Sequence, residues 1–372
     1  MPPAEALKRI VQRRAQLGRD LCILGHHYQR DEIFQFADLT GDSLKLSQQA
    51  AATRSRTIVF CGVHFMAESA DILTGGERVV ILPDLSAGCT MADLAEADDV
   101  AEAMARLSAA AGEDKVVPVA YVNSSADVKA LTGRSGGACC TSSNARNVFE
   151  WALRPAAEGG AGGKKVLAIP DEHLARNTAV AMGYGLDDCA VYDPHLPGGG
   201  LSDADVRRAT FLLWKGNCYV HQRFTVAQIE RVRADRAGIR VIVHPECPYE
   251  VVQASDLSGS TEQILRAVNE APAGSGWAVG TETNMVRRLA ADNPDKFVRV
   301  LSDTPPLCLT MARIDPAHLL WVLDNLVEGR VVNRIQVAPD VAADARLALE
   351  RMVSIKPSQK AAATRAGRRR AR

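Results

Sequence analysis

The sequence predicts an α/β fold of three pseudo-symmetric, doubly wound αβα domains of the Rossmann-like kind, arranged around one central site. Short runs of Val, Ile and Leu alternate with helical patterns along the chain. Nearly all of these runs end in Gly, Pro or polar residues, as parallel strands do where they open into a loop. The motifs at these ends recur with matched spacing, which indicates an internal repeat.

Nine apolar runs are the candidate strands, and two helices are expected outside them. Residues 1–19 are predicted to form an N-terminal outer helix, and His318–Glu328 a helix that packs back on the body. The candidate strands are Leu21–Leu24, Thr57–Cys61, Val79–Leu82, Val116–Val122, Val166–Ile169, Phe211–Trp214, Val241–Val243, Trp277–Val279 and Phe297–Leu301.

The first and third repeats have nearly the same spacing. His26 and Ser43 are 17 residues apart, as are His244 and Thr261. A cysteine lies 63 residues after His26, and another lies 64 residues after His244. Ligands of open parallel sheets bind beyond the carboxyl ends of the strands. We therefore expect all of these strand ends to converge on one pocket.

The middle repeat is looser. Tyr121 and Ser142 are 21 residues apart, as if Thr132–Gly137 carried about four extra residues. The Gly-rich stretches Glu158–Gly163 and Pro197–Gly200 are predicted surface loops. The repeat then gives αβα domains at 20–112, 113–236 and 237–353, followed by a disordered basic tail at 354–372 that holds seven of the chain's 44 Lys and Arg.

The composition is that of a soluble globular protein. The 372 residues are 47% hydrophobic and 24% charged, with a formal net charge of zero. No apolar run approaches the roughly 18 residues of a membrane span, and the N-terminus has no signal pattern, so a cytoplasmic protein without membrane or nucleic-acid partner is expected. Nine scattered cysteines in such a chain favour metal or catalytic use over a disulfide framework.

Three of the cysteines, Cys89, Cys218 and Cys308, occupy one repeat position. Three thiolates can hold a [4Fe–4S] cluster and leave one iron open as a Lewis acid. Core cysteines or a three-thiolate zinc site remain alternatives, although no C-x₂-C pair is present. The cysteines predicted to be structural are Cys22, Cys61, Cys139, Cys140 and Cys189, while Cys247 either lines the pocket or lies outside the repeat.

Polar residues at the strand ends and helix starts are the candidates for chemistry. Glu246, with His244 nearby, is the best general acid–base candidate. His221 lies either near the cluster or on the surface. Ser43, Ser142 and Thr261 each precede a helical run, which indicates an N-cap, an anion site or both. The strand-end pairs spaced i, i+2 are His26 and Tyr28, Tyr121 and Asn123, and His244 and Glu246.

Ten short motifs over residues 20–335 together resemble the quinolinate synthase A family. They are Gly25-His26-His27-Tyr28-Gln29, Gly41-Asp42-Ser43-Leu44, Gly88-Cys89-Thr90-Met91-Ala92, Tyr121-Val122-Asn123, Thr141-Ser142-Ser143-Asn144-Ala145, Trp214-Lys215-Gly216-Asn217-Cys218, His244-Pro245-Glu246, Gly259-Ser260-Thr261, Gly280-Thr281-Glu282-Thr283 and Cys308-Leu309-Thr310-Met311. The first motif departs from the commoner family forms, and the loops near 132–137 and 193–203 are insertions relative to the pattern.

The resemblance implies an enzyme that condenses iminoaspartate (iminosuccinate) with dihydroxyacetone phosphate to give quinolinate, phosphate and water in NAD biosynthesis. It implies one [4Fe–4S] cluster on Cys89, Cys218 and Cys308 with one open iron site. L-aspartate oxidase or aspartate dehydrogenase would supply the iminoaspartate.

The resemblance also assigns roles to individual residues. Glu246, Tyr28, His26 and Tyr121 are the expected catalytic residues. The expected substrate-binding residues are His26, Ser43, Tyr121, Val122, Asn123, Ser142, His244, Pro245, Glu246 and Thr261. Two other classes stay open from the residues alone: an aconitase-like [4Fe–4S] hydro-lyase, and a non-catalytic iron–sulfur sensor whose basic tail binds DNA.

Overall fold

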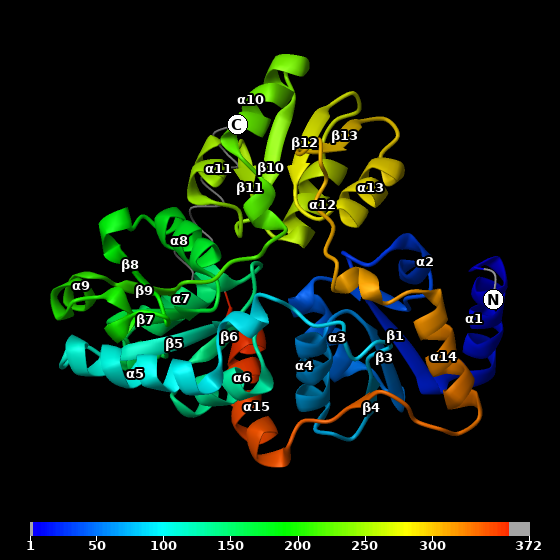
Figure 1. Ribbon diagram of the computed structural model, residues 1–372, viewed down its shortest axis with the longest axis horizontal. Coiled ribbons are helices and arrows are strands. Elements are labelled where there is room, and N and C mark those ends of the chain that lie inside the picture. The colour runs from blue at the N-terminus through cyan, green and yellow to red at the C-terminus, as the bar shows by residue number, and fades with distance from the viewer. Residues whose placement is uncertain (1–2, 357–372) are drawn as a thin grey trace.

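The computed structural model describes residues 3–356 and has three lobes, each built on one sheet (Figure 1). Four strands in each lobe have the same order: the fourth lies beside the third, the first comes next, and the second is at the edge. All neighbours within these four-strand units pair in parallel. The prediction of three doubly wound units is confirmed.

The first domain contains a sheet of order β4-β3-β1-β2 with helices on its faces. All six residues of β1 are buried, because a parallel sheet is covered on both sides. Its strands are β1 Leu21–His26, β2 Leu39–Gly41, β3 Thr57–Cys61 and β4 Val79–Ile81, and its helices are α2 Asp31–Phe34, α3 Ser43–Ala52 and α4 His64–Thr74.

The second domain repeats this order and adds the edge strand β8, which the sequence analysis missed. Helix α5 was expected in the first domain but packs against the second. The strands are β5 Val116–Tyr121, β6 Ala138–Cys140, β7 Lys165–Ile169, β8 Cys189–Tyr192 and β9 Phe211–Trp214. The helices are α5 Ala97–Ala111, α6 Ala126–Arg134, α7 Ala145–Leu153, α8 Glu172–Ala181 and α9 Asp203–Arg208.

The extra residues of the middle repeat lengthen a helix. The predicted insertion at Thr132–Gly137 begins inside α6, which has nine residues, whereas α2 at the same repeat position has four. Gly133 is buried where α15 crosses α6, and a Cβ there would lie 1.9 Å from the carbonyl oxygen of Asp344. The loop expected here is therefore present only in part: Thr132–Arg134 belong to α6, on which α15 packs, and residues 135–137 form the turn that leads into β6.

The third domain contains the smallest of the three sheets, with four strands. It has its own apolar core, separate from the core shared by the first two domains. Its strands are β10 Arg240–Val243, β11 Leu257–Ser258, β12 Gly276–Gly280 and β13 Phe297–Val300, and its helices are α10 Val226–Asp235, α11 Tyr249–Ala254, α12 Thr261–Asn269 and α13 Thr283–Asp292.

After β13 the chain returns to the first two domains, although the predicted third domain reaches residue 353 (Figure 1). Both expected helices are present, and α14 (Pro316–Val327) packs on α1 (Pro3–Leu17). Strand β14 (Arg334–Ile335) pairs antiparallel with β4, and α15 (Pro339–Ser354) packs on α6. All but the first three residues of the predicted tail lie outside the described residues.

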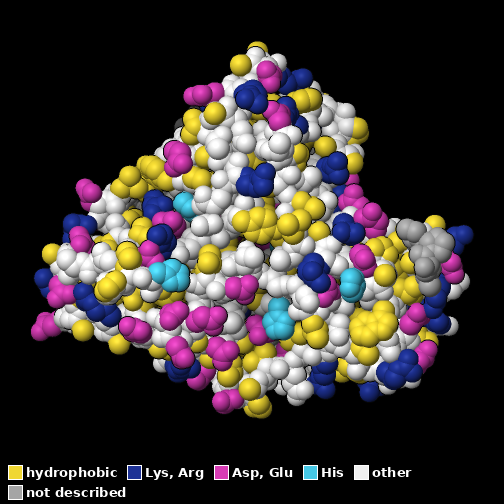
Figure 2. Space-filling view, viewed as in Figure 1, with side chains coloured by type: hydrophobic (Ala, Val, Ile, Leu, Met, Phe, Trp, Pro, Cys, Tyr) yellow, Lys and Arg dark blue, Asp and Glu magenta, His cyan; other side chains and the backbone are white. Residues whose placement is uncertain are grey.

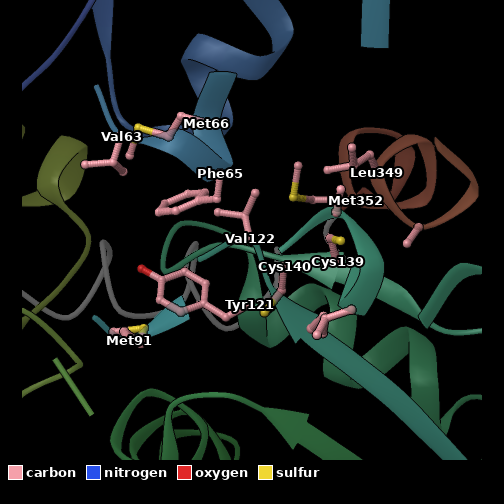
Figure 3. Close-up of a cluster of buried hydrophobic side chains, with 14 of the residues drawn as sticks. Val63, Phe65, Met66, Met91, Tyr121, Val122, Cys139, Cys140, Leu349 and Met352 are labelled. Carbon is pink, nitrogen blue, oxygen red and sulfur yellow. The ribbon is translucent and has the colours of Figure 1, made fainter. Parts of the chain in front are cut away.

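Helix α15 helps to join the first two domains. Figure 3 shows Leu349 and Met352 of this helix in one apolar cluster with Phe65 and Met66 of the first domain and Val122 of the second. The third domain is attached to the first in part by polar contacts instead. The Arg288 guanidinium donates to the carbonyl oxygen of Gln29 at 2.7 Å and to the carboxylate of Asp31 at 2.6 Å.

Candidate active site

The strand ends of the three sheets surround one central cavity with about 630 Å³ of empty space, part of it open to solvent. Its place beyond the carboxyl ends of parallel strands is where α/β folds bind small-molecule ligands. The cavity is lined by residues of all three domains, including twelve predicted site residues: His26, Tyr28, Ser43, Cys89, Tyr121, Asn123, Ser142, Cys218, His244, Glu246, Thr261 and Cys308.

Val122 and Pro245 do not line the cavity. The Val122 side chain is buried in the apolar cluster and points toward Phe65, whereas the Tyr121 ring extends in another direction (Figure 3). The carbonyl oxygen of Pro245 accepts a hydrogen bond of 2.8 Å from Asn177. These two residues therefore shape the strand ends, and their predicted substrate contact stays a prediction.

Each of the three lining cysteines follows the fourth strand of its domain and precedes a 3₁₀ turn by three residues. The turns are Ala92–Leu94, His221–Arg223 and Met311–Arg313. Backbone N–H groups at the starts of these turns face the sulfur atoms and favour their thiolate forms. The repeat thus places three thiols in equivalent local surroundings around one cavity.

The chemistry of this donor set fits a thiolate-bound cluster. Burial raises the pKa of Cys89 to about 12 and also raises the pKa of Cys218 and Cys308. Neighbouring acidic groups raise each pKa further, and the Cys308 thiol is one of them for both Cys89 and Cys218. Three thiolates that line one cavity need bound cations, and sulfur ligands select iron–sulfur clusters or zinc. The other cysteines, Cys22, Cys61, Cys139, Cys140, Cys189 and Cys247, do not line the cavity.

A chain of hydrogen bonds joins two of the predicted catalytic residues. The Tyr28 hydroxyl lies 2.7 Å from Oγ1 of Thr281, which lies 3.1 Å from Nε2 of His221. Nδ1 of His221 is 2.7 Å from Oε2 of Glu246, and the Tyr121 hydroxyl donates to Oε1 of Glu246 at 2.5 Å. A carboxylate only accepts, so Nδ1 of His221 carries a proton and donates to Glu246. The chain thus links the Tyr28 hydroxyl to the Glu246 carboxylate through Thr281 and His221.

Electrostatics set the protonation states of Glu246 and the two tyrosines. Burial acts to raise the pKa of Glu246, but His244, His221 and the hydrogen bonds outweigh it and lower the pKa to about 2. Burial and the nearby Glu246 raise the pKa of both Tyr28 and Tyr121 well above 10. At neutral pH the site therefore holds one carboxylate between two protonated phenols.

Two histidines at equivalent strand ends share one arrangement. Nδ1 of His26 accepts from the N–H of Tyr28 at 3.1 Å, and Nδ1 of His244 accepts from the N–H of Glu246 at 3.4 Å. Their Nε2 atoms therefore carry the proton, and that of His244 donates to the Ser142 hydroxyl at 3.2 Å. Burial lowers the pKa of each ring to about 3, so both are neutral donors.

The three hydroxyls at the helix starts are not the N-caps, contrary to one prediction. Asp42 caps α3 and Ser260 caps α12 through their side chains, so Ser43 and Thr261 are the first helical residues. Ser142 lies two residues before Asn144, the N-cap position of α7. The Thr261 hydroxyl is buried without a hydrogen-bond partner, and so is Oδ1 of Asn123. These two unpaired atoms at the cavity wall are free to bind a ligand.

His221 and Thr281 are the main site residues that the sequence analysis did not assign. The side chain of His221 is buried beside Glu246. Its ring stacks on the ring of His244, with 4.4 Å between the two ring centroids. Atoms of Cys218, His221 and Glu246 lie close enough to hold a single metal ion. The hydrogen bonds described above already satisfy His221 and Glu246, so we assign these two residues to the hydrogen-bond chain.

On the face shown in Figure 2, the described residues form no large patch of one charge sign. Lys and Arg are interspersed there with Asp and Glu, and apolar side chains gather near the centre (Figure 2). Within residues 3–356, no helix has both the length and the apolar character needed to cross a membrane. The DNA-binding alternative depends on the basic tail, nearly all of which lies outside residues 3–356.

Comparisons with known proteins point to one family. The family model described as "Quinolinate synthetase A protein" matches residues 8–354. A quinolinate synthase of a Nocardioides species is 52% identical over 361 residues, covering 95% of this chain and 91% of that protein. The quinolinate synthase of Streptomyces coelicolor is 53% identical, covering 92% and 86%. That of Geobacillus kaustophilus is 51% identical, covering 94% and 93%.

Proposed function

The chain belongs to the quinolinate synthetase A family and is a quinolinate synthase, and on that premise we propose how its residues carry out the reaction. The substrates are iminoaspartate and dihydroxyacetone phosphate, and the products quinolinate, phosphate and water. The observation that carries the proposal is the convergence of three thiols, the Glu246 carboxylate, two phenols and unpaired polar atoms in one cavity.

The family is one of [4Fe–4S] enzymes, and Cys89, Cys218 and Cys308 are the residues that would hold the cluster here. When bound through three thiolates, the cluster supplies one open iron as a Lewis acid. Cys218 and Cys308 come from different domains, and Tyr219 joins their loops. Its hydroxyl accepts from the N–H of Leu309 at 2.5 Å and donates to the carbonyl oxygen of Leu307 at 3.3 Å.

Glu246 is the general base and Tyr121 and Tyr28 are the proton donors. The ionised Glu246 carboxylate accepts a proton from the condensed substrate, and either phenol protonates an oxygen that leaves as water. The hydrogen bonds from Tyr28 through Thr281 and His221 to Glu246 couple the protonation of this phenol to that of the carboxylate.

Neutral donors and helix starts hold the negative charges of the substrates. Ser43 and Thr261 are the first residues of α3 and α12, and Ser142 precedes α7, so positive helix ends face the cavity there. The unpaired hydroxyl of Thr261 and the Nε2–H group of His26 add donors without adding charge. Two or three carboxylate or phosphate groups can be bound by such dispersed donors.

Product analysis separates this function from the aconitase-like alternative. Anaerobically purified protein should form quinolinate from iminoaspartate and dihydroxyacetone phosphate, and should release one phosphate for each quinolinate. Loss of both products after removal of iron by a chelator is also expected. Hydration or dehydration of a hydroxy acid without quinolinate formation would contradict the proposal. Supply of iminoaspartate by L-aspartate oxidase or aspartate dehydrogenase, and a cytoplasmic location, stay predictions.

A further inference from the structure

The Ser143 hydroxyl lies where helix starts of all three domains meet. Its oxygen is 2.5 Å from Oδ2 of Asp42, the N-cap of α3 in the first domain. It is 2.8 Å from Oγ of Ser260, the N-cap of α12 in the third domain. Ser143 itself belongs to the second domain, in the turn that precedes α7. One hydroxyl therefore contacts both other domains, next to the cavity-lining residue Ser142.

The direction of these hydrogen bonds follows from counting protons. A serine hydroxyl has one proton to donate, and a carboxylate has none. Ser143 therefore donates to Asp42, and the Ser260 hydroxyl donates to Ser143. The other oxygen of Asp42 accepts from the backbone N–H of Lys45 at 2.9 Å. Each oxygen of the Asp42 carboxylate is thus bound by a donor, one at the helix start and one at Ser143.

Asp42 needs such restraint because it lines the same cavity as the three anion-binding hydroxyls. It is almost fully buried, at 6% exposed. A carboxylate that turned its free lone pairs toward the cavity would repel the carboxylate of a substrate, and the buried surroundings would screen that repulsion weakly. The bond from Ser143 holds this negative charge against the protein.

We propose that Ser143 is a positioning residue that orients the Asp42 carboxylate away from the substrate anions and sets the three helix starts in register. This inference rests on the proposed function, because it requires anionic ligands in the cavity. Ser143 contacts no ligand itself in this role. It acts through the orientation of Asp42, which distinguishes it from the binding hydroxyls Ser43, Ser142 and Thr261.

The test compares four proteins: the wild type, Ser143→Ala, Asp42→Asn and the double variant. The probe is quinolinate, a dianion, bound to the cluster-containing enzyme and measured by anaerobic calorimetry together with KM and kcat. Ser143→Ala should weaken binding and raise KM about tenfold, with a smaller change in kcat, because a released carboxylate repels the ligand. Asparagine still caps a helix but has no charge, so Asp42→Asn should restore binding in the Ser143→Ala background.

Two further variants separate orientation from stability. Ser143→Thr keeps the hydroxyl and should bind quinolinate as the wild type does. Ser202→Ala removes the exposed N-cap of α9, far from the site, and should lower stability without changing binding. If Ser143→Ala bound quinolinate within twofold of the wild type, or if the double variant stayed as weak as the single one, the role of Ser143 would be overturned. A wild-type protein that bound quinolinate but formed none from the two substrates would overturn the proposed function, and not the role of Ser143.

Discussion

Oγ1 of Thr281 lies 2.7 Å from the hydroxyl of Tyr28, although 253 residues separate the two in the chain. Tyr28 follows the first strand of the first domain, and Thr281 follows the third strand of the third domain. Thr281 also contacts His221, so one hydroxyl connects the phenol to the imidazole that holds Glu246. The path from Tyr28 to Glu246 thus leaves the first domain at Tyr28, enters the third at Thr281, passes through His221 of the second and returns to the third at Glu246.

Thr281→Val should slow turnover because valine keeps the shape of threonine but removes the hydroxyl that links Tyr28 to His221. We expect kcat to fall about a hundredfold, the lower end of the range for proton-transfer catalysis, with little change in KM. Thr281→Ser keeps the hydroxyl and should retain most of the activity. Steady-state kinetics on both variants, with equal iron content, make the comparison. Equal kcat values for the two would exclude a proton path through Thr281.

Glu246→Gln should retain the cluster but lose at least about a hundredfold in turnover, because an amide keeps the size of the side chain and cannot accept a proton. Iron and sulfide content and the rate of quinolinate formation are the measurements. Tyr121→Phe is the companion variant, since it removes the 2.5 Å hydrogen bond to Oε1 and leaves the base in place. Near-normal turnover of Glu246→Gln would move the base role to another group.

Changing Cys89, Cys218 or Cys308 to serine should each abolish bound iron and sulfide, because thiolates hold the cluster. Cys189→Ser is the control: this cysteine is half-buried in β8 and does not line the cavity. Iron and sulfide per chain, measured after anaerobic purification, decide the outcome. A full cluster in the Cys218→Ser protein would show that the ligand set is different.

The free energy of unfolding should decrease as the pH falls below 6.5. His26 and His244 have a pKa of about 3 in the folded chain and near 6.5 when unfolded, so between these values the unfolded chain binds two protons that the folded chain does not. Each histidine then contributes a loss of about 1.4 kcal/mol for every pH unit below 6.5.

Denaturant unfolding at pH 7.5 and pH 5.5 measures this loss. In His26→Asn, whose amide oxygen can still accept from the N–H of Tyr28, the loss over this interval should be smaller by about 1.4 kcal/mol. An identical decrease in the variant and the wild type would mean that His26 is protonated in the folded protein.

Local sequence patterns determined most of the fold. The nine predicted strands are all present, because runs of apolar residues bounded by Gly, Pro and polar residues reflect burial and turn formation within a few neighbours. The repeat spacing also placed Cys89, Cys218 and Cys308 at equivalent positions, since residues at the same step of a repeated unit meet the same sheet edge.

The tertiary structure decided what depends on contacts between distant segments. Nothing near Ser43 or Thr261 indicates that Asp42 and Ser260 are the caps, because a Ser or Thr beside another capping residue is locally equivalent to it. The residues around His221 do not reveal whether its ring faces solvent or Glu246. Helix α15 packs on α6 of the second domain because the apolar face of α15 fits against α6. Gly133 of α6 allows the two helices to approach closely. Such docking depends on the shapes of surfaces that exist only after each domain has folded.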